Sequence, residues 1–163
     1  LLGRVELYVV LAPLERMMAS QDARVRAAVM RAARSLFFKR TFVALFEGLA
    51  DADPLVRREA AQTVETLHVA HALDPLSRIY REAREPEIRR SAFVSIGKIP
   101  TFAAAEMLVE VLRNADKVER DLARDLLVRA EHADVTSLVS RAAADEQGPL
   151  RAEFDRILRA RGA

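Results

Sequence analysis

Residues 53–67 read DPLVRREAAQTVETL, and this pattern recurs along the chain. Residues 22–36 read DARVRAAVMRAARSL, and residues 85–99 read EPEIRRSAFVSIGKI. Weaker copies are DKVERDLARDLLVR at 116–129 and QGPLRAEFDRILRAR at 147–161. Near its start each copy has one aliphatic residue, here called the anchor; the anchors are Val25, Val56, Ile88, Val118 and Leu150. Successive anchors are 31, 32, 30 and 32 residues apart, and a near-constant period of this length predicts a repeat architecture.

Within a copy, apolar residues recur at the anchor and four, eight and eleven positions later, which is the spacing of one helical face. A second apolar stretch precedes each anchor, at 13–19, 42–49, 75–83, 105–112 and 135–143. Each repeat is therefore predicted to contain a helix A, a turn that carries an acid, and a helix B. Two helices cannot bury both apolar faces alone, so we expect the hairpins to stack into an α-solenoid. An irregular helical bundle is the alternative.

Composition narrows the functional classes. Of the 163 residues, 51% are apolar and 31% are charged, as in an ordered protein that folds in water. The net charge of +2 does not require a nucleic-acid or membrane partner. The chain has no cysteine, which excludes disulfides, thiol catalysis and cysteine-ligated zinc and fits a cytoplasmic location. No apolar run approaches the ~20 residues that cross a bilayer, so no membrane insertion is expected.

The pattern Asp-x-x-Val-Arg-x-x-Ala-x-x-x-Leu-Gly resembles the HEAT-like repeat, particularly the short bacterial kind related to phycobilisome-lyase repeats. The residues that carry it are Asp53, Pro54, Val56, Arg57, Ala60 and Leu67, and again Glu85, Pro86, Ile88, Arg89, Ala92, Ile96 and Gly97. The resemblance implies an all-α, right-handed superhelix of about five hairpins, and a bacterial scaffold rather than an enzyme. The repeats would span approximately 12–36, 42–67, 75–99, 105–129 and 135–161, in a single domain over 1–163.

The first residues extend this prediction. Leu2, Gly3, Arg4 and Val5 resemble the end of a helix B at 96–99. We therefore expect the chain to be the C-terminal part of a longer protein.

One column of charged residues suggests a structural role. Arg26, Arg57 and Arg89 directly follow an anchor, and the acids Asp22, Asp53 and Glu85 precede the same anchors by three positions. Because acid and base recur together, we expect a ladder in which each arginine pairs with an acid of its own or a neighbouring turn. The alternative is a phosphate-binding strip of arginines.

A second column, here called the B-helix stripe, lies two, six and nine positions after the anchors. Its members are Arg31, Arg34, Arg58, Arg90, Arg120, Arg124, Arg156 and Arg159. In solenoids of this kind the B helices line the concave surface, so the stripe is a candidate partner-binding face. The alternative is a solvated face of mixed charge, because several acids lie close by and dilute the positive charge: Glu59, Glu65, Asp121, Asp125, Glu153 and Asp155. The predicted partner-binding residues are Arg58, Arg90, Arg124, Arg31, Arg34 and Arg120. The expected partner is another protein with an acidic surface, and Arg58, Arg90 and Arg124 are preferred because they lie in central repeats.

The sequence gives less support to a metal site, an enzyme or a nucleic-acid-binding module. His68, His71 and His132 lack the paired His-Glu motifs of HEAT-like hydroxylases, so neither a metal nor another cofactor is expected. A nucleic-acid-binding module, resembling a degenerate HEAT-like DNA glycosylase, is the second functional hypothesis. Such enzymes use an aromatic-lined cleft, whereas this chain has no tryptophan and only Tyr8 and Tyr80. Phe37 and Phe38 are adjacent, so both cannot point into one core; packing under the next helix A is expected, and an exposed contact residue is the alternative. We therefore expect a non-catalytic scaffold.

Overall fold

A computed structural model of the protein describes residues 12–34 and 41–163. All regular elements in these residues are helical, which confirms the predicted all-α fold of stacked HEAT-like hairpins. Residues 12–18 form a first helix. The others are α2 (Ala23–Ala33), α3 (Thr41–Leu49), α4 (Pro54–Val64), η1 (Ala70–Ala72), α5 (Leu73–Glu82), α6 (Pro86–Gly97), α7 (Phe102–Asn114), α8 (Lys117–Arg129), α9 (Val135–Ala144) and α10 (Gly148–Ala160).

Acidic caps begin several of the B helices. The Asp22 carboxylate accepts a hydrogen bond from the Arg24 amide at 2.8 Å, and Asp53 does the same for the Leu55 amide. Asp116 accepts from the Glu119 amide at 3.0 Å. Each carboxylate satisfies an amide that has no partner inside its helix, which fixes where the helix starts. The acid of the repeat is thus first of all a helix cap.

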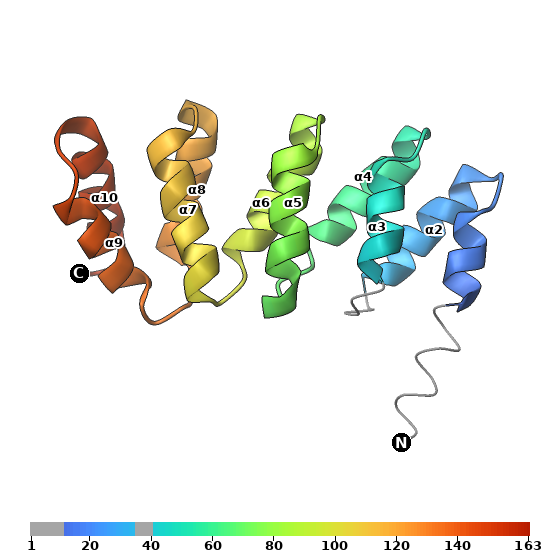
Figure 1. Ribbon diagram of the computed structural model, residues 1–163, viewed down its shortest axis with the longest axis horizontal. Coiled ribbons are helices and arrows are strands. Elements are labelled where there is room, and N and C mark those ends of the chain that lie inside the picture. Colours follow the sequence, from blue (N-terminus) through green and yellow to red (C-terminus); the bar gives the residue numbers. More distant parts are fainter. Residues whose placement is uncertain (1–11, 35–40) are drawn as a thin grey trace, which may run out of the picture. The chain divides into compact units, whose positions relative to one another are not determined.

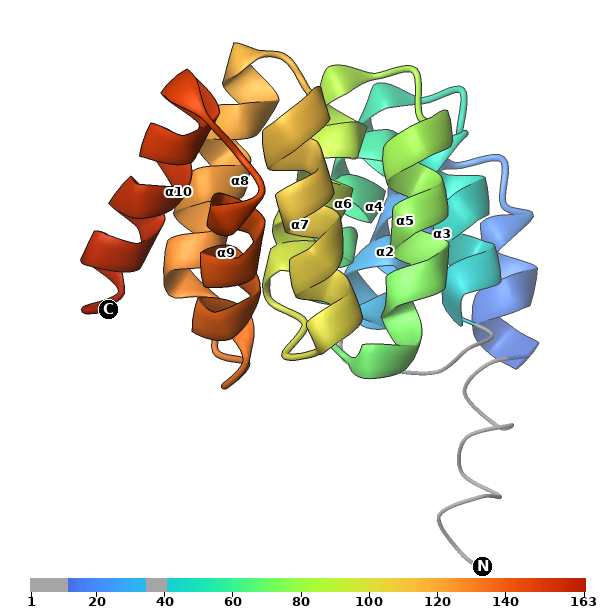
Figure 2. The same ribbon diagram turned by 60° about the vertical axis from the view of Figure 1, so that its left-hand side comes forward.

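The chain forms two compact units, and the boundary between Ser95 and Ile96 falls inside α6. In the first unit, the A helices α3 and α5 lie side by side, with the B helices α2 and α4 behind them (Figures 1 and 2). In the second unit, α7 and α9 form the A layer and α8 and α10 form the B layer (Figure 2). Each unit therefore has the two-layer arrangement of stacked hairpins.

The core of the first unit combines small and large apolar residues. Val56, Ala60 and Val64 on α4 are fully buried, as the helical spacing of the repeat predicts. Gly48 on α3 allows a close approach, because a Cβ at this position would lie 3.2 Å from the Cβ of Ala60 and even closer to the side chain of Met30. The glycine therefore lets α3 pack tightly against both α2 and α4.

The fourth repeat has a different register from the predicted one. Val118, expected to be an anchor, is 77% exposed. In the other repeats the anchor lies three residues after the N-cap, and the same count from the N-cap Asp116 leads to Glu119. Arg120 therefore occupies the ladder position directly after the anchor, and its Nε lies 3.4 Å from the Asp116 carbonyl oxygen. Counted from Glu119, Arg120 lies one position and Arg124 five positions after the anchor, so the spacing that placed both residues in the B-helix stripe shifts by one in this repeat.

Residues 1–11 and 35–40 lie outside the described residues. The expectations for Leu2, Gly3, Arg4 and Val5, and for Tyr8, Phe37 and Phe38, fall on these segments.

Candidate functional site

The ladder position of the first repeat holds a bidentate ion pair between neighbouring repeats. Arg26 on α2 donates from Nε and Nη2 to the two carboxylate oxygens of Asp51, at 2.7 and 2.9 Å. Asp51 follows α3 in the turn of the next hairpin, and its side chain is only 9% exposed. Arg26 also donates from Nη1 to the Ser20 carbonyl oxygen at 2.8 Å. The guanidinium of Arg26 thus contacts both the turn before its own helix and the adjacent repeat.

The ion pair shifts the titration of both partners. Hydrogen bonding from Arg26 lowers the pKa of the Asp51 carboxyl, despite some burial that acts in the opposite direction. The same hydrogen bond raises the pKa of Arg26. The charged form of Asp51 is therefore the one that the fold stabilises.

The other ladder arginines make different contacts. Arg57 on α4 donates from Nη1 to the carbonyl oxygens of Asp51 and Ala52, both at 2.8 Å. The guanidinium of Arg89 on α6 lies 5.6 Å from the ring centre of Tyr80. Glu85 precedes α6, and its carbonyl oxygen accepts hydrogen bonds from the amides of Ile88 and Arg89. Arg26 and Arg57 thus both contact carbonyl oxygens of the preceding turn, and Arg26 adds a bidentate contact with a carboxylate.

Part of the B-helix stripe is used between repeats. Arg34 lies 2.6 Å from a Glu59 carboxylate oxygen, and Arg31 lies 3.2 Å from the other. Glu59 belongs to α4, so these contacts join the B helices of adjacent repeats. The next pair of B helices is joined by the Ser91 hydroxyl, which donates to Glu65 at 2.8 Å.

Buried hydroxyl groups add a second contact between B helices. The Thr63 hydroxyl lies 2.7 Å from the carbonyl oxygen of Met30, near the end of α2. The Ser95 hydroxyl donates to the carbonyl oxygen of Leu67. Both carbonyls lie at or beyond a helix end, where the helix itself offers no donor.

Arg124 is also held by acids, in the second unit. Its Nη1 lies 2.9 Å from Asp121 on the same helix and 3.2 Å from Glu153 on α10. The hydrogen bond to Glu153 is the main cause of the raised pKa of Arg124, whose side chain is 27% exposed. The structure therefore places Arg31, Arg34 and Arg124 in ion pairs within the chain.

Arg58 and Arg90 have different surroundings. Both side chains are exposed, and they lie at equivalent positions of adjacent repeats, 32 residues apart. Within residues 12–34 and 41–163, neither forms an ion pair or a hydrogen bond through its guanidinium. Among the described residues, no acid of the chain occupies their N–H donors, which leaves them able to bind a carboxylate of another molecule.

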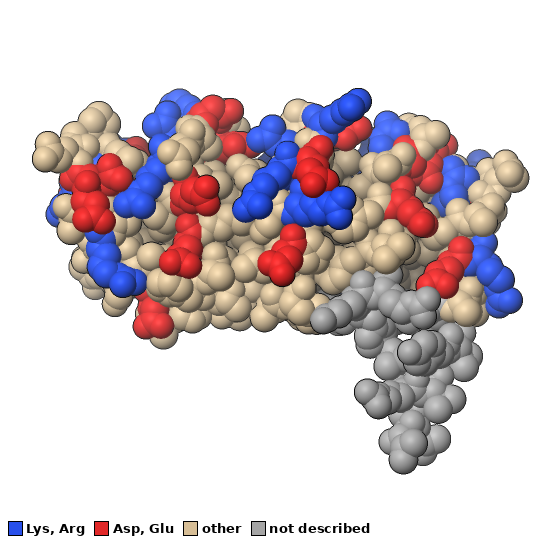
Figure 3. Space-filling view, in the orientation of Figure 1, with Lys and Arg blue, Asp and Glu red and all other residues tan. Residues whose placement is uncertain are grey.

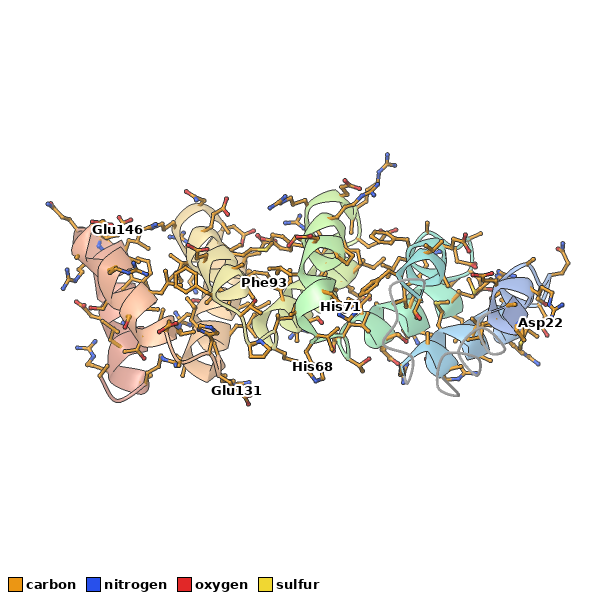
Figure 4. All side chains as sticks on the ribbon, turned by 60° about the horizontal axis from the view of Figure 1, so that its bottom comes forward. Asp22, His68, His71, Phe93, Glu131 and Glu146 are labelled. Atoms are coloured by element: carbon orange, nitrogen blue, oxygen red, sulfur yellow. The ribbon has the colours of Figure 1, made fainter. Side chains whose placement is uncertain are left out.

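The histidines do not form a metal centre. His68 and His71 are not on one helical face, because α4 ends at Val64 and His71 belongs to η1. His71 packs edge-on against Phe42, with the ring centres 6.3 Å apart. In the second unit, Glu131 and Glu146 lie at opposite ends of α9 (Figure 4). No group of three or more potential metal ligands occurs among the described residues.

Charge on the A-helix side is mixed. Lysine and arginine side chains lie among aspartate and glutamate side chains over both units, without a continuous basic track on the face drawn (Figure 3). In the part of the chain that the structure describes, no helix combines the length and apolar character needed to cross a membrane.

Two acids that the sequence did not single out, Asp51 and Glu59, form ion pairs between repeats. Asp51 was not predicted as a ladder residue, because the repeat pattern selects Asp53 from the Asp-x-Asp of residues 51–53. In the sequence, Glu59 stands out only as one of several acids beside the B-helix stripe. The signal for Glu59 was its position on helix B, six residues after the N-cap, facing the preceding repeat.

The comparisons with known proteins agree with this architecture. A search of curated proteins found no match. A protein-family model described as HEAT repeats matches residues 42–128, which is more than half of the chain. HEAT repeats are generally protein-interaction scaffolds and typically non-catalytic. On this match and on its stacked helical hairpins, the chain belongs to the HEAT-repeat family.

Proposed function

We propose that this protein is a non-catalytic scaffold whose B-helix stripe binds an acidic surface of another protein, with Arg58 and Arg90 at the centre of the contact. The observation that carries the proposal is the contrast within the stripe. Arg31, Arg34 and Arg124 are held in ion pairs within the chain, whereas Arg58 and Arg90 are exposed without an acid partner among the described residues.

The arrangement favours a protein partner. Arg58 and Arg90 are presented by α4 and α6 at the same repeat position, so the regular stacking sets their separation. Arginine forms planar bidentate contacts with carboxylates and is enriched among residues that dominate binding energy. A bacterial cytoplasmic location is part of the proposal, and a chain without cysteine fits a reducing compartment.

Charge reversal tests the proposal. The protein carrying Arg58→Glu and Arg90→Glu should keep its stability within about 0.5 kcal/mol, because both residues are exposed. Its affinity for the partner identified by affinity purification should fall by about 1–3 kcal/mol. The control is Arg24→Glu with Arg81→Glu, the same charge change at two exposed positions outside the stripe.

Two results would contradict this function. Equal loss of the partner in the stripe variant and the control would show a general charge effect rather than a site. A nucleic-acid binder would instead retain single-stranded DNA, with an affinity that falls steeply as salt increases. Isothermal titration with a 20-nucleotide single strand at two salt concentrations distinguishes that outcome.

A further inference from the structure

The acid that pairs with the ladder arginine is missing where the α3–α4 hairpin meets the α5–α6 hairpin. Asp51, the partner of Arg26, lies five residues before the anchor Val56. The residue five positions before the anchor Ile88 is Ala83. Arg57 therefore lacks the bidentate acid that Arg26 has, because a methyl group stands where the carboxylate would be.

A pocket of about 430 Å³ opens at this position, between the C-terminal ends of α3 and α5 and the start of α6. These ends of α3 and α5 stand at the top of the first unit in Figure 1. The apolar lining includes Leu49, Ile79 and Ile88, which are themselves at most 8% exposed. Ala83 and Arg57 also line the pocket. The absent carboxylate thus coincides with a cavity that has apolar walls and one guanidinium.

Two backbone contacts position Arg57, and its side chain forms no ion pair among the described residues. Its Nη1 is held by two backbone carbonyl oxygens at 2.8 Å, which fixes the orientation of the guanidinium. Among the described residues its side chain forms no ion pair, so Nε and Nη2, the two donors that Arg26 uses for Asp51, have no carboxylate partner. A planar group held in this way loses little further freedom when it binds an anion.

None of the other charged side chains of the lining forms an ion pair with Arg57. Asp51 is paired with Arg26, and Glu82 lies 3.0 Å from Arg78. The remaining lining charges are Arg84 and Glu85, which have opposite sign. Arg57 also attracts Asp51 at longer range, which contributes to the lowered pKa of Asp51, but no carboxylate of the lining contacts the Nε or Nη2 donors of Arg57.

We propose that this pocket binds an acidic side chain of a partner protein, whose carboxylate takes the place at Arg57 that Asp51 takes at Arg26. A glutamate or aspartate next to an aliphatic residue fits both the guanidinium and the apolar walls. The site is separate from Arg58 and Arg90, so it can exist whether or not the B-helix stripe binds a partner.

The proposal can be tested by introducing a carboxylate of the chain itself into the pocket. Ala83→Asp should restore the missing carboxylate and pair it with Arg57, whereas Ala83→Asn has nearly the same size without the charge. The probe is the peptide acetyl-Leu-Glu-Leu-Leu-amide, with acetyl-Leu-Gln-Leu-Leu-amide as its uncharged control. Nuclear magnetic resonance follows the Nε–H signal of Arg57 in the whole chain during each titration.

The expected result is a saturable shift of the Arg57 signal with the Glu peptide, with a Kd of about 1 mM or below. The Gln peptide should bind at least tenfold more weakly. Ala83→Asp should weaken the Glu peptide at least tenfold and raise Tm above that of Ala83→Asn, which should bind the peptide within about threefold of the wild type.

Three results would overturn the proposal. The first is equal binding of the Glu and Gln peptides, and the second is the absence of a saturable shift up to 10 mM, a concentration about tenfold above the expected Kd. The third is an Ala83→Asp protein that binds the Glu peptide as well as Ala83→Asn does. None of these results depends on the state of Arg58 and Arg90, so failure of this site is distinguishable from failure of the stripe.

Discussion

Two successive junctions of the first unit use the same repeat positions for different contacts. Where α2 meets the α3–α4 hairpin, Gly48 permits close packing and Asp51 closes the ladder with Arg26. One repeat later, Tyr80 and Ala83 occupy these two positions. Tyr80 stacks on Phe93 with ring centres 4.9 Å apart, and a pocket opens beside Ala83.

The difference shows which positions the fold requires. The anchors Val56 and Ile88 are buried at both junctions, so the apolar face of helix B is kept. The positions before the anchor vary in size and charge without loss of the stacking. Variation there can create a site while the repeat stays intact, as expected where function is added to a common fold.

The largest expected effect is at the first junction, at Gly48. Gly48→Leu should lower the free energy of unfolding by about 3 kcal/mol, because the new side chain would be forced against Met30 and Ala60. Tyr80→Leu, at the equivalent position of the next repeat, should have a smaller effect. Urea unfolding of both variants measures the difference, and an equal loss would mean that the two junctions are packed alike.

Removal of the Asp51 carboxylate should have the next largest effect. Asp51→Ala removes three hydrogen bonds at 2.7–2.9 Å, two from Arg26 and one from the Asp53 amide, and should cost about 2–3 kcal/mol. Asp53→Ala, which removes only the cap of α4, should cost about 1 kcal/mol. Thermal unfolding compares the two variants. A larger loss for Asp53→Ala would show that the cap, rather than the ladder, sets the stability of this junction.

The first junction should also depend on acidity. The pKa of Asp51 is lower in the folded protein than its ordinary value of about 3.9, so its contribution to stability is complete above that value and is lost as pH falls through the folded pKa. The stability difference between the wild type and Asp51→Asn should therefore be constant from pH 7 to about pH 5 and shrink below about pH 4. Urea unfolding at several pH values checks this, and a difference that is unchanged at pH 3 would contradict it.

The smallest expected effects concern the contacts between B helices. Glu59→Gln weakens two arginine contacts at the first junction and should cost about 1 kcal/mol, since the carboxylate is only 16% exposed. Ser91→Ala removes one hydrogen bond at the second junction and should cost about 0.5 kcal/mol. Thermal unfolding compares the two variants, and Glu59→Gln should lower the stability more than Ser91→Ala if the ion pairs contribute more than the hydroxyl. The reverse order would show that solvent screens the Glu59 contacts almost completely.

The sequence predicted the helices well because burial imposes a period on each of them. Val56, Ala60 and Val64 follow that period and are buried, whereas Val118 shows its limit. A short pattern match selects the nearest aliphatic residue, but the cap Asp116 fixes where α8 begins and shifts the register by one position. Counting from the cap would have avoided this error.

The contacts of the arginines were harder to predict. Which acid meets Arg26 depends on how adjacent hairpins are offset, and the spacing within a single repeat does not contain that information. The same offset decides that Arg34 reaches Glu59 while Arg58 stays exposed. The pocket beside Arg57 could have been suspected only by comparing Asp51 with Ala83 across repeats.

Because of the hydroxyl contacts, the two ends of the first unit should differ in how easily they unfold. Thr63 can turn its hydroxyl from the Met30 carbonyl to the Glu59 carbonyl of its own helix, 2.8 Å away, so it still has an acceptor when the preceding repeat is removed. The Met30 carbonyl lies in the last turn of α2, so if the following repeat were removed its helix would offer no donor and only water could replace Thr63. Fraying that begins with α2 should therefore leave α4 better satisfied than fraying in the opposite direction would leave α2. In a single-molecule pulling experiment, this unit should unfold at a lower force when it is pulled from its first repeat than from its last.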